Sequence, residues 1–167
     1  MPPVALTPVT DTTRPVLERL WQLYLHDLSE FRGTMPDEHG LFKAGRLPGY
    51  LVDDEDHGAY LIGTGGTGGT VAGFALLRGL VHEPRTIGEF FVLRAVRRHR
   101  VGHDAAVTTL REHPGAWEIA FQEENPGAAR FWRQVATDVA GTSWREERRP
   151  VPGKPEIPPD VWLMLQT

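Results

Sequence analysis

The order of two hydrophobic periods along the chain constrains its fold more than any other feature. Residues 14–31 place apolar side chains every three or four positions, which is typical of a helix with one buried face. Three short apolar runs with strand character follow, at 59–63, 70–80 and 87–93. The first two runs are close enough for a hairpin, and the third adds an antiparallel neighbour. This half of the chain predicts a mixed, mostly antiparallel central sheet flanked by helices.

The second half of the chain alternates the same two periods. A helix that starts after the third run ends at His113, Pro114 and Gly115, which are strong stop signals. Asn125 and Pro126 suit the start of the next helix, as cap and first-turn residue. The elements predicted in this half are a helix at 102–113, a strand at 117–122, a helix at 125–141 and strands at 143–147 and 161–165. We find no internal repeat, and we therefore predict one α/β domain that spans residues 1–167.

Composition excludes several classes of protein. With 40% hydrophobic and 24% charged residues, the 167-residue chain is typical of a soluble globular domain. Its net charge of −4 argues against a nucleic-acid binder, because such proteins usually carry a basic excess. The absence of cysteine rules out disulfides, thiolate metal sites and a cysteine nucleophile. Since no signal-peptide pattern and no membrane-spanning apolar run is found, we predict a cytoplasmic protein without a membrane partner.

A basic stretch, RRHRVGHDAA at residues 97–106, joins the third apolar run to the next helix. The first turn of a helix leaves about four backbone N–H groups unpaired and carries partial positive charge. A tight turn that enters such a helix from a strand can bind an anion, and Gly102 lets a ligand approach the backbone closely. Arg97, Arg98 and Arg100 add positive charge that suits a pyrophosphate or a 3′-phosphate. The alternative is a solvated basic turn without a ligand.

Two segments resemble motifs of the GNAT superfamily, the acyl-CoA-dependent N-acyltransferases. FFVLRAVRRHRVGHDAA, at residues 90–106, resembles motif A, whose signature is Gln/Arg-x-x-Gly-x-Gly/Ala between a strand and a helix. Arg97 takes the first position of this signature and Gly102 the last. NPGAARFW, at 125–132, resembles motif B, and the order of elements is similar to that of the superfamily over nearly the whole chain. The block from 87 to 135 looks most like a group of bacterial predicted acetyltransferases. The resemblance implies a GNAT-like fold, N-acetyltransferase activity and acetyl-CoA as co-substrate.

The resemblance also implies where acetyl-CoA binds. Backbone groups of one strand would pair with the pantetheine arm, the following turn would hold the pyrophosphate, and the second motif would flank the sulfur end. The residues in these three roles are Phe91, Val92 and Leu93; then Arg97, Arg98, His99, Arg100, Val101, Gly102 and His103; and finally Asn125, Phe131 and Trp132.

Three positions bear on how well the motifs match. Arg100 replaces the first motif glycine, so its N–H can still bind a phosphate while its side chain either clamps the ligand or crowds the site. Asp104 suits the start of its helix but disfavours a pyrophosphate unless it points away. Trp132 replaces the tyrosine that often donates a proton in this superfamily, and an indole does not act as an acid. We expect Trp132 to pack against the pantetheine or the core.

Acyl transfer to an amine needs a base, a polarised thioester carbonyl and, in some enzymes, an acid for the leaving thiolate. Glu89 is the candidate base, because it is a carboxylate inside an otherwise apolar strand, where partial burial favours proton uptake. The alternative for Glu89 is a solvent-facing carboxylate paired with Arg78. Tyr24 is the candidate acid, with Tyr60 as an alternative, unless the thiolate leaves unassisted, which the low pKa of a thiol permits.

The resemblance implies a small-molecule or peptide amine as acceptor, and we expect direct transfer in a ternary complex because no nucleophile suggests an acyl-enzyme. Asp27, Glu30, Asp37 and Glu38 could attract a cationic amine, although an ordinary polar surface is the alternative. Superfamily members are often dimers, so a homodimer is a further expectation. The substitutions in the two motifs motivate a rival hypothesis, namely a non-catalytic acyl-CoA-binding or regulatory domain.

Three further patterns predict no site. GTGGTG at 63–68 has the letters of a dinucleotide fingerprint, but a strand pattern follows instead of a helix, so we predict a hairpin turn. DDEDHG at 53–58 starts like a calcium loop, but Thr64 stands where the last ligand should be a glutamate. His99 and His103 lack a third ligand, so no metal site is expected.

Overall fold

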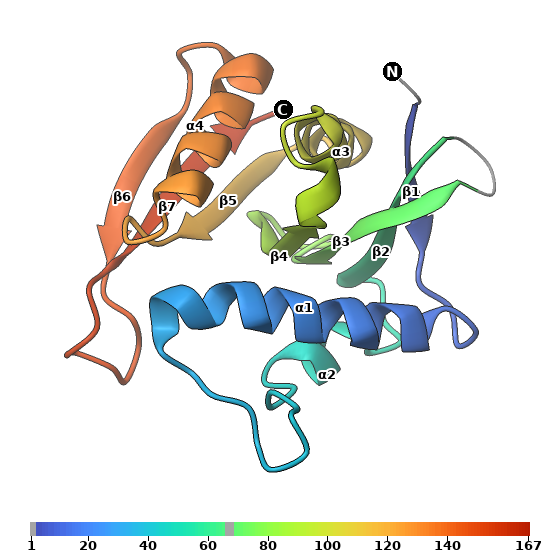
Figure 1. The fold of residues 1–167 in the computed structure, drawn as a ribbon. Coiled ribbons are helices and arrows are strands. Elements are labelled where there is room, and N and C mark those ends of the chain that lie inside the picture. Colours follow the sequence, from blue (N-terminus) through green and yellow to red (C-terminus); the bar gives the residue numbers. More distant parts are fainter. Residues whose placement is uncertain (1–2, 66–68) are drawn as a thin grey trace.

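A sheet and four α-helices make up this computed structural model, which describes residues 3–65 and 69–167 (Figure 1). The strands are β1 (Val4–Pro8), β2 (His57–Thr64), β3 (Thr70–Arg78), β4 (Arg85–Val92), β5 (Ala116–Phe121), β6 (Arg145–Arg149) and β7 (Asp160–Gln166). The helices are α1 (Arg14–Arg32), α2 (Leu47–Tyr50), α3 (Val101–Glu112) and α4 (Pro126–Ala140), with a short 3-10 turn, η1, at Arg94–Val96. None of these helices combines the length and the apolar character needed to cross a membrane.

All seven strands belong to one sheet, in the order β1-β2-β3-β4-β5-β7-β6. Five of the six neighbouring pairs are antiparallel, and β4 and β5 form the single parallel pair in the described residues. A parallel pair needs a crossover, which α3 supplies between these two strands. The predicted mixed, mostly antiparallel sheet is therefore confirmed.

The helices cover both faces of the sheet, α1 and α2 on one face and α3 and α4 on the other (Figure 1). Side chains of successive strand residues point to opposite faces, so the sheet supplies one half of each core. The core under α1 and α2 contains Leu17, Trp21, Leu47, Phe74, Leu76 and Phe91. The core under α3 and α4 contains Leu77, Ile87, Leu110, Trp117, Val135 and Leu163.

The predicted order of elements is wrong at the N-terminus, where β1 precedes α1. β1 has only five residues and ends in a proline, so it lacks a clear period of its own; its pairing with β2 makes it a strand. The helices and strands that the sequence predicts are present, with ends within two residues of the predicted ones. The pairing of β2 with β3 confirms the predicted hairpin, although residues 66–68 of its glycine-rich turn lie outside the described residues.

Candidate active site

A one-residue bulge in β4 determines which face Glu89 occupies. Leu76 pairs with Glu89, but the next residue of β3, Leu77, pairs with Ile87, so Gly88 is an extra residue in β4. Ile87 packs in the core under α3 and α4, and the bulge turns Glu89 to the opposite face, toward α1 and α2. Without the bulge, residues 87 and 89 would share one face.

Glu89 is 3% exposed and contacts two polar side chains from the α1–α2 side. The Tyr24 hydroxyl, on α1, donates a hydrogen bond to Glu89 Oε2 at 2.5 Å. Arg46, which immediately precedes α2, places Nη2 2.8 Å from Oε1. No N–H of Arg46 is aligned with Oε1, so within the described residues this buried oxygen has an ion-pair contact but no hydrogen bond. Glu89 is therefore a buried carboxylate rather than a solvent-facing partner of Arg78.

Two tyrosines beside Glu89 are held in their protonated form. Burial, and next to it the charge of Glu89, raises the pKa of Tyr24 well above its ordinary value of 10.0. Burial also raises the pKa of Tyr50, on α2, and the charge of Glu89 adds to this effect. The Tyr50 hydroxyl lies against Gly88: a Cβ on that glycine would be 1.8 Å from the hydroxyl oxygen. The absence of a side chain at Gly88 thus permits the close approach of α2 to β4.

The two parallel strands separate beyond their first residues. β4 and β5 pair at Arg85 with Trp117, Thr86 with Glu118, and Ile87 with Ile119 only, while β5 stays paired with β7 up to Phe121. The second half of β4, which carries Glu89, therefore faces an opening in the sheet.

Backbone groups of β4 face this opening at alternate residues. The N–H of Leu93 donates to Ala72 on β3, so the backbone groups of the preceding residue, Val92, point away from β3. The Val92 carbonyl accepts a hydrogen bond from Arg97 Nε at 2.8 Å. Phe91 and Leu93 flank Val92 on either side, so by alternation their backbone groups face β3. Of the three residues expected to contact a pantetheine arm, Val92 is therefore the one whose backbone faces the opening.

The turn between β4 and α3 presents free backbone donors. Among the described residues, no acceptor is found for the N–H groups of Arg98, Arg100, Val101, Gly102 or His103. Most of them belong to the first turn of a twelve-residue helix, where the dipole adds partial positive charge. The side chains of Arg98, His99 and Arg100 are exposed around them.

The backbone of this turn explains why glycine suits the first motif position. Arg98 and Arg100 have φ angles of 70° and 62°, in the left-handed region that favours glycine. Gly102 has a different role: a Cβ there would lie 3.2 Å from Val92 and 3.6 Å from the Phe131 ring, so its small size allows α3 to approach β4 and α4.

Arg97 and Asp27 connect the turn to α1. Arg97 and Arg94 both donate hydrogen bonds to the Asp27 carboxylate, in addition to the bond from Arg97 to Val92. Burial opposes ionisation of Asp27, but the hydrogen bonds from the two arginines outweigh it and lower its pKa. Arg97 is thus directed at α1 and at the edge of β4.

Asp104 is turned toward its neighbours on the helices. It contacts His103 at 3.1 Å and Arg100 at 3.7 Å, and His103 reaches across to Asp138 of α4 at 2.7 Å. A cavity of about 500 Å³ lies beside these side chains, between α3 and α4. The contact with His103 also lowers the pKa of Asp138.

The second motif contributes a cap and an aromatic cluster. Asn125 caps α4, because its side chain accepts a hydrogen bond from the Ala128 N–H at 3.1 Å. Phe131 stacks on Phe90 of β4 with ring centroids 5.8 Å apart, and Trp132 lies edge-on to both rings. Trp132 is 7% exposed and belongs to the core, which agrees with its expected packing role.

The acidic residues considered for the acceptor do not gather at Glu89. Asp27 is occupied by two arginines, and Asp37 accepts hydrogen bonds from the backbone of its own turn. Glu38 is almost fully exposed and Glu30 lies on an exposed part of α1. Sequence reasoning missed Arg46, which is the charged residue that does contact Glu89 and which lies in a loop without periodicity.

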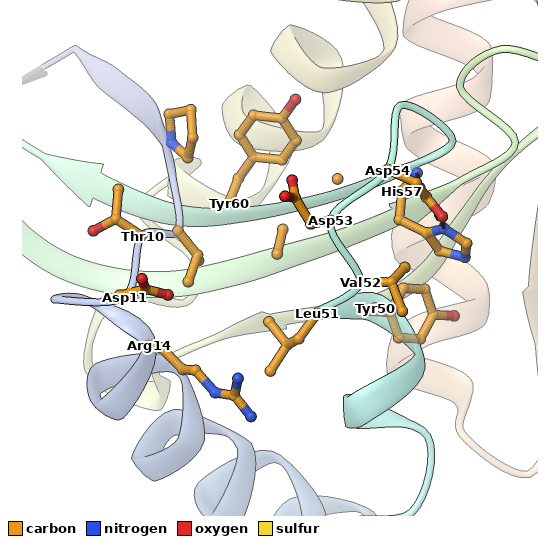
Figure 2. A pocket seen from close by; sticks show the side chains of 14 residues that line it. Thr10, Asp11, Arg14, Tyr50, Leu51, Val52, Asp53, Asp54, His57 and Tyr60 are labelled. Carbon is orange, nitrogen blue, oxygen red and sulfur yellow. Dashed lines mark hydrogen bonds and ion pairs between the residues drawn. The ribbon is translucent and has the colours of Figure 1, made fainter.

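A second cavity, of about 580 Å³, lies beside the end of β1 and the start of β2 (Figure 2). The turn before α1, the segment after α2 and the first residues of β2 line it, with Asp11, Arg14 and Asp53 among its charged side chains. The Tyr50 hydroxyl points away from Arg14 and Asp11 in this view (Figure 2). Tyr50 lines this cavity and also lies against Gly88 of β4, so the cavity adjoins the surroundings of Glu89.

Comparisons with known proteins agree on the fold. No family model and no curated protein sequence matches this chain. Spermidine N-acetyltransferase from Vibrio cholerae, solved with CoA and spermine, has a TM-score of 0.67 at 12% identity, covering 98% of this chain and 95% of that one. A GCN5-related N-acetyltransferase from Kribbella flavida has a TM-score of 0.63 at 15% identity, covering 98% of each chain. A GNAT-family acetyltransferase from Staphylococcus aureus Mu50 has a TM-score of 0.61 at 12% identity, covering 96% of this chain and 97% of that one. The GNAT-like fold that the motifs predict is confirmed.

Proposed function

We propose that this chain is an acetyl-CoA-dependent N-acetyltransferase, which transfers an acetyl group directly to a primary amine of a small molecule or peptide. The observation that supports this most is the contact of the Tyr24 hydroxyl with the buried Glu89, which lies on β4 beyond the residues that pair with β5. A carboxylate at that point can take a proton from an amine that enters the opening. The single-domain organisation and the cytoplasmic location remain predictions.

The turn between β4 and α3 fits the diphosphate of acetyl-CoA. Its free N–H groups and the exposed guanidinium groups of Arg98 and Arg100 supply donors and positive charge, and Asp104 is engaged by His103 and Arg100. The backbone of Val92 would hydrogen-bond the pantetheine arm after the Arg97 side chain releases the Val92 carbonyl, which it contacts in this structure. The helix that starts after Asn125, with Phe131, would flank the opening.

When bound, acetyl-CoA would supply a thioester whose C–S bond breaks as the amine nitrogen forms the new C–N bond. Glu89 accepts the proton that the amine loses, and the Tyr24 hydroxyl holds the carboxylate in place from α1. Because the pKa of Tyr24 is raised further above that of a thiol, Tyr24 is a poor proton donor to the leaving thiolate. We therefore assign Tyr24 a positioning role, with the thiolate leaving unassisted.

Calorimetric titration with acetyl-CoA tests the binding half of this proposal. We expect micromolar binding, at least about tenfold weaker for Arg100→Glu because the reversed charge repels a phosphate. Arg19→Glu is the matched control, since Arg19 is exposed on α1 and has no ion pair among the described residues. The absence of binding to folded protein would refute the proposal.

Release of free thiol with a panel of amines tests the catalytic half. Glu89→Gln should keep acetyl-CoA binding and lower turnover roughly 10²–10⁴-fold, the usual contribution of a general base. Binding without turnover on any amine would instead favour the rival hypothesis of a non-catalytic acyl-CoA-binding domain. Turnover that Glu89→Gln leaves unchanged would exclude Glu89 as the base.

A further inference from the structure

The position of Arg46 beside Glu89 bears on which amine the site accepts. The Arg46 side chain is 64% exposed, while that of Glu89 is 2% exposed, so the guanidinium covers the outer side of the carboxylate. Nη2 contacts Oε1, and the other N–H groups of Arg46 have no partner in the described part of the chain, so they are free to bind a second anion. Among the described residues Oε1 accepts no aligned hydrogen bond, and it is shielded from solvent, so a ligand reaches it only when the Arg46 side chain moves. The pair thus offers a carboxylate oxygen and unused donors to a ligand that carries both charges.

The segment that leads to Arg46 is held against α1. The Trp21 indole donates to the Ala44 carbonyl at 2.8 Å, and Gln22 exchanges two hydrogen bonds with the backbone of Phe42. Trp21 is 2% exposed, so this anchor belongs to the core. Arg46 also directly precedes α2, whose Leu47 is buried. The position of the guanidinium therefore follows from a packed segment.

The charges around Glu89 do not suit an acceptor that is only cationic. Arg46 already balances the charge of Glu89, and Arg32 is near enough, with Arg46, to influence the ionisation of Tyr24. The acidic residue of α1 on this side, Asp27, is neutralised by two arginines. An amine without an anionic group would have to displace Arg46 from Glu89 and leave the guanidinium without a partner.

We propose that the acceptor is an amino carboxylate, with the carboxylate within one or two carbons of the amine, as in a free amino acid. The amine would contact Glu89 Oε1 as the exposed Arg46 side chain turns from it to the substrate carboxylate, for which a guanidinium is well shaped. This assignment rests on the proposed function for the transfer step, but it makes a separate claim about binding. Arg46 is then a residue that determines specificity.

Matched compounds provide the test. Each member of a panel of amino acids is compared with its own carboxamide and with the amine that lacks the carboxyl group. Binding is measured without acetyl-CoA, by calorimetric titration, and turnover is measured with acetyl-CoA by thiol release. The proteins are the wild type, Arg46→Ala, Arg46→Lys and the control Arg19→Ala. The amine of a carboxamide deprotonates more easily than that of the amino acid, so the expected preference runs against intrinsic reactivity.

We expect at least one amino acid to bind, and to react with kcat/KM about tenfold or more above that of its carboxamide, because a charge-assisted pair is lost in the carboxamide. Arg46→Ala should remove this preference, Arg46→Lys should keep part of it, and Arg19→Ala should leave it unchanged. Amino-acid binding that depends on Arg46, without any acetyl-CoA turnover, would support this inference and refute the proposed function. Equal use of carboxamides or simple amines, a preference that survives in Arg46→Ala, or no amino-acid binding would overturn the inference.

Discussion

Replacement of Tyr24 by phenylalanine isolates the hydrogen bond that holds Glu89. The ring contacts remain, since Trp21 and Phe91 lie 5.1 and 6.0 Å from the Tyr24 ring centroid, whereas the 2.5 Å bond to Oε2 is lost. A hydrogen bond to a charged group contributes about 1.5–3 kcal/mol, and part of this is regained because no hydroxyl is buried in the variant. We expect the free energy of unfolding at pH 7 to fall by about 1–2 kcal/mol. For a chain of this size the melting temperature should fall by roughly 2–8 °C.

The size of the destabilisation by Tyr24→Phe depends on pH. The folded protein raises the pKa of Tyr24 above the unfolded value near 10, so the stabilisation is fully present below pH 10. Above that pH the unfolded chain loses the tyrosine proton and the folded chain keeps it, so wild-type stability falls by up to about 1.4 kcal/mol per pH unit. Tyr24→Phe lacks this loss. The gap between the two proteins should therefore narrow between pH 9 and 11.

Urea unfolding at pH 7, 9 and 11 measures both effects. Tyr60→Phe is the control, because burial also raises the pKa of Tyr60 but its hydroxyl has no hydrogen-bond partner among the described residues. We expect that control to change stability at pH 7 by less than about 0.5 kcal/mol, as surface-type substitutions do. Equal stability of Tyr24→Phe and wild type at pH 7 would refute a stabilising bond to Glu89. A gap that stays constant up to pH 11 would refute the raised pKa.

Two further substitutions test the backbone of the site. Gly88→Ala should lower the free energy of unfolding by about 1–3 kcal/mol in urea, because the new Cβ would lie 1.8 Å from the Tyr50 hydroxyl. Gly49→Ala is the control and should not destabilise, since a Cβ at Gly49 would have no atom within 4 Å. Arg100→Gly should leave stability within about 0.5 kcal/mol of wild type, because relief of the left-handed conformation offsets the greater freedom of the unfolded chain. Arg19→Gly, inside α1, should lose about 1 kcal/mol, and an equal loss at Arg100 would contradict the strain argument.

The parts of the site that the sequence predicts are those with a local signal. Glu89 stands out as a carboxylate in an apolar strand, and Tyr24 as a polar aromatic in a helical stripe, and each is recognisable without the other. Their contact joins residues 65 positions apart. The turn at Arg98 and Arg100 is recognisable by its charge and by its place between a strand and a helix.

The parts that the sequence does not predict depend on tertiary packing. Arg46 lies in a loop without hydrophobic period, and its place beside Glu89 follows from the anchoring of that loop to Trp21 and Gln22. The separation of β4 from β5 is likewise a property of two strands together, and both runs look like ordinary strands when taken singly. β1 is missed for the same reason, because it is defined by its pairing with β2.

The extra residue in β4 has a consequence for how this chain could change over generations. Deletion of Gly88 would leave Leu76 opposite Glu89 and Leu77 opposite Ile87 in strict alternation, so the carboxylate would keep its face. Sequences that share an ancestor with this chain can therefore lack this residue and still present the carboxylate toward α1 and α2, but without the bend that a bulge gives a strand.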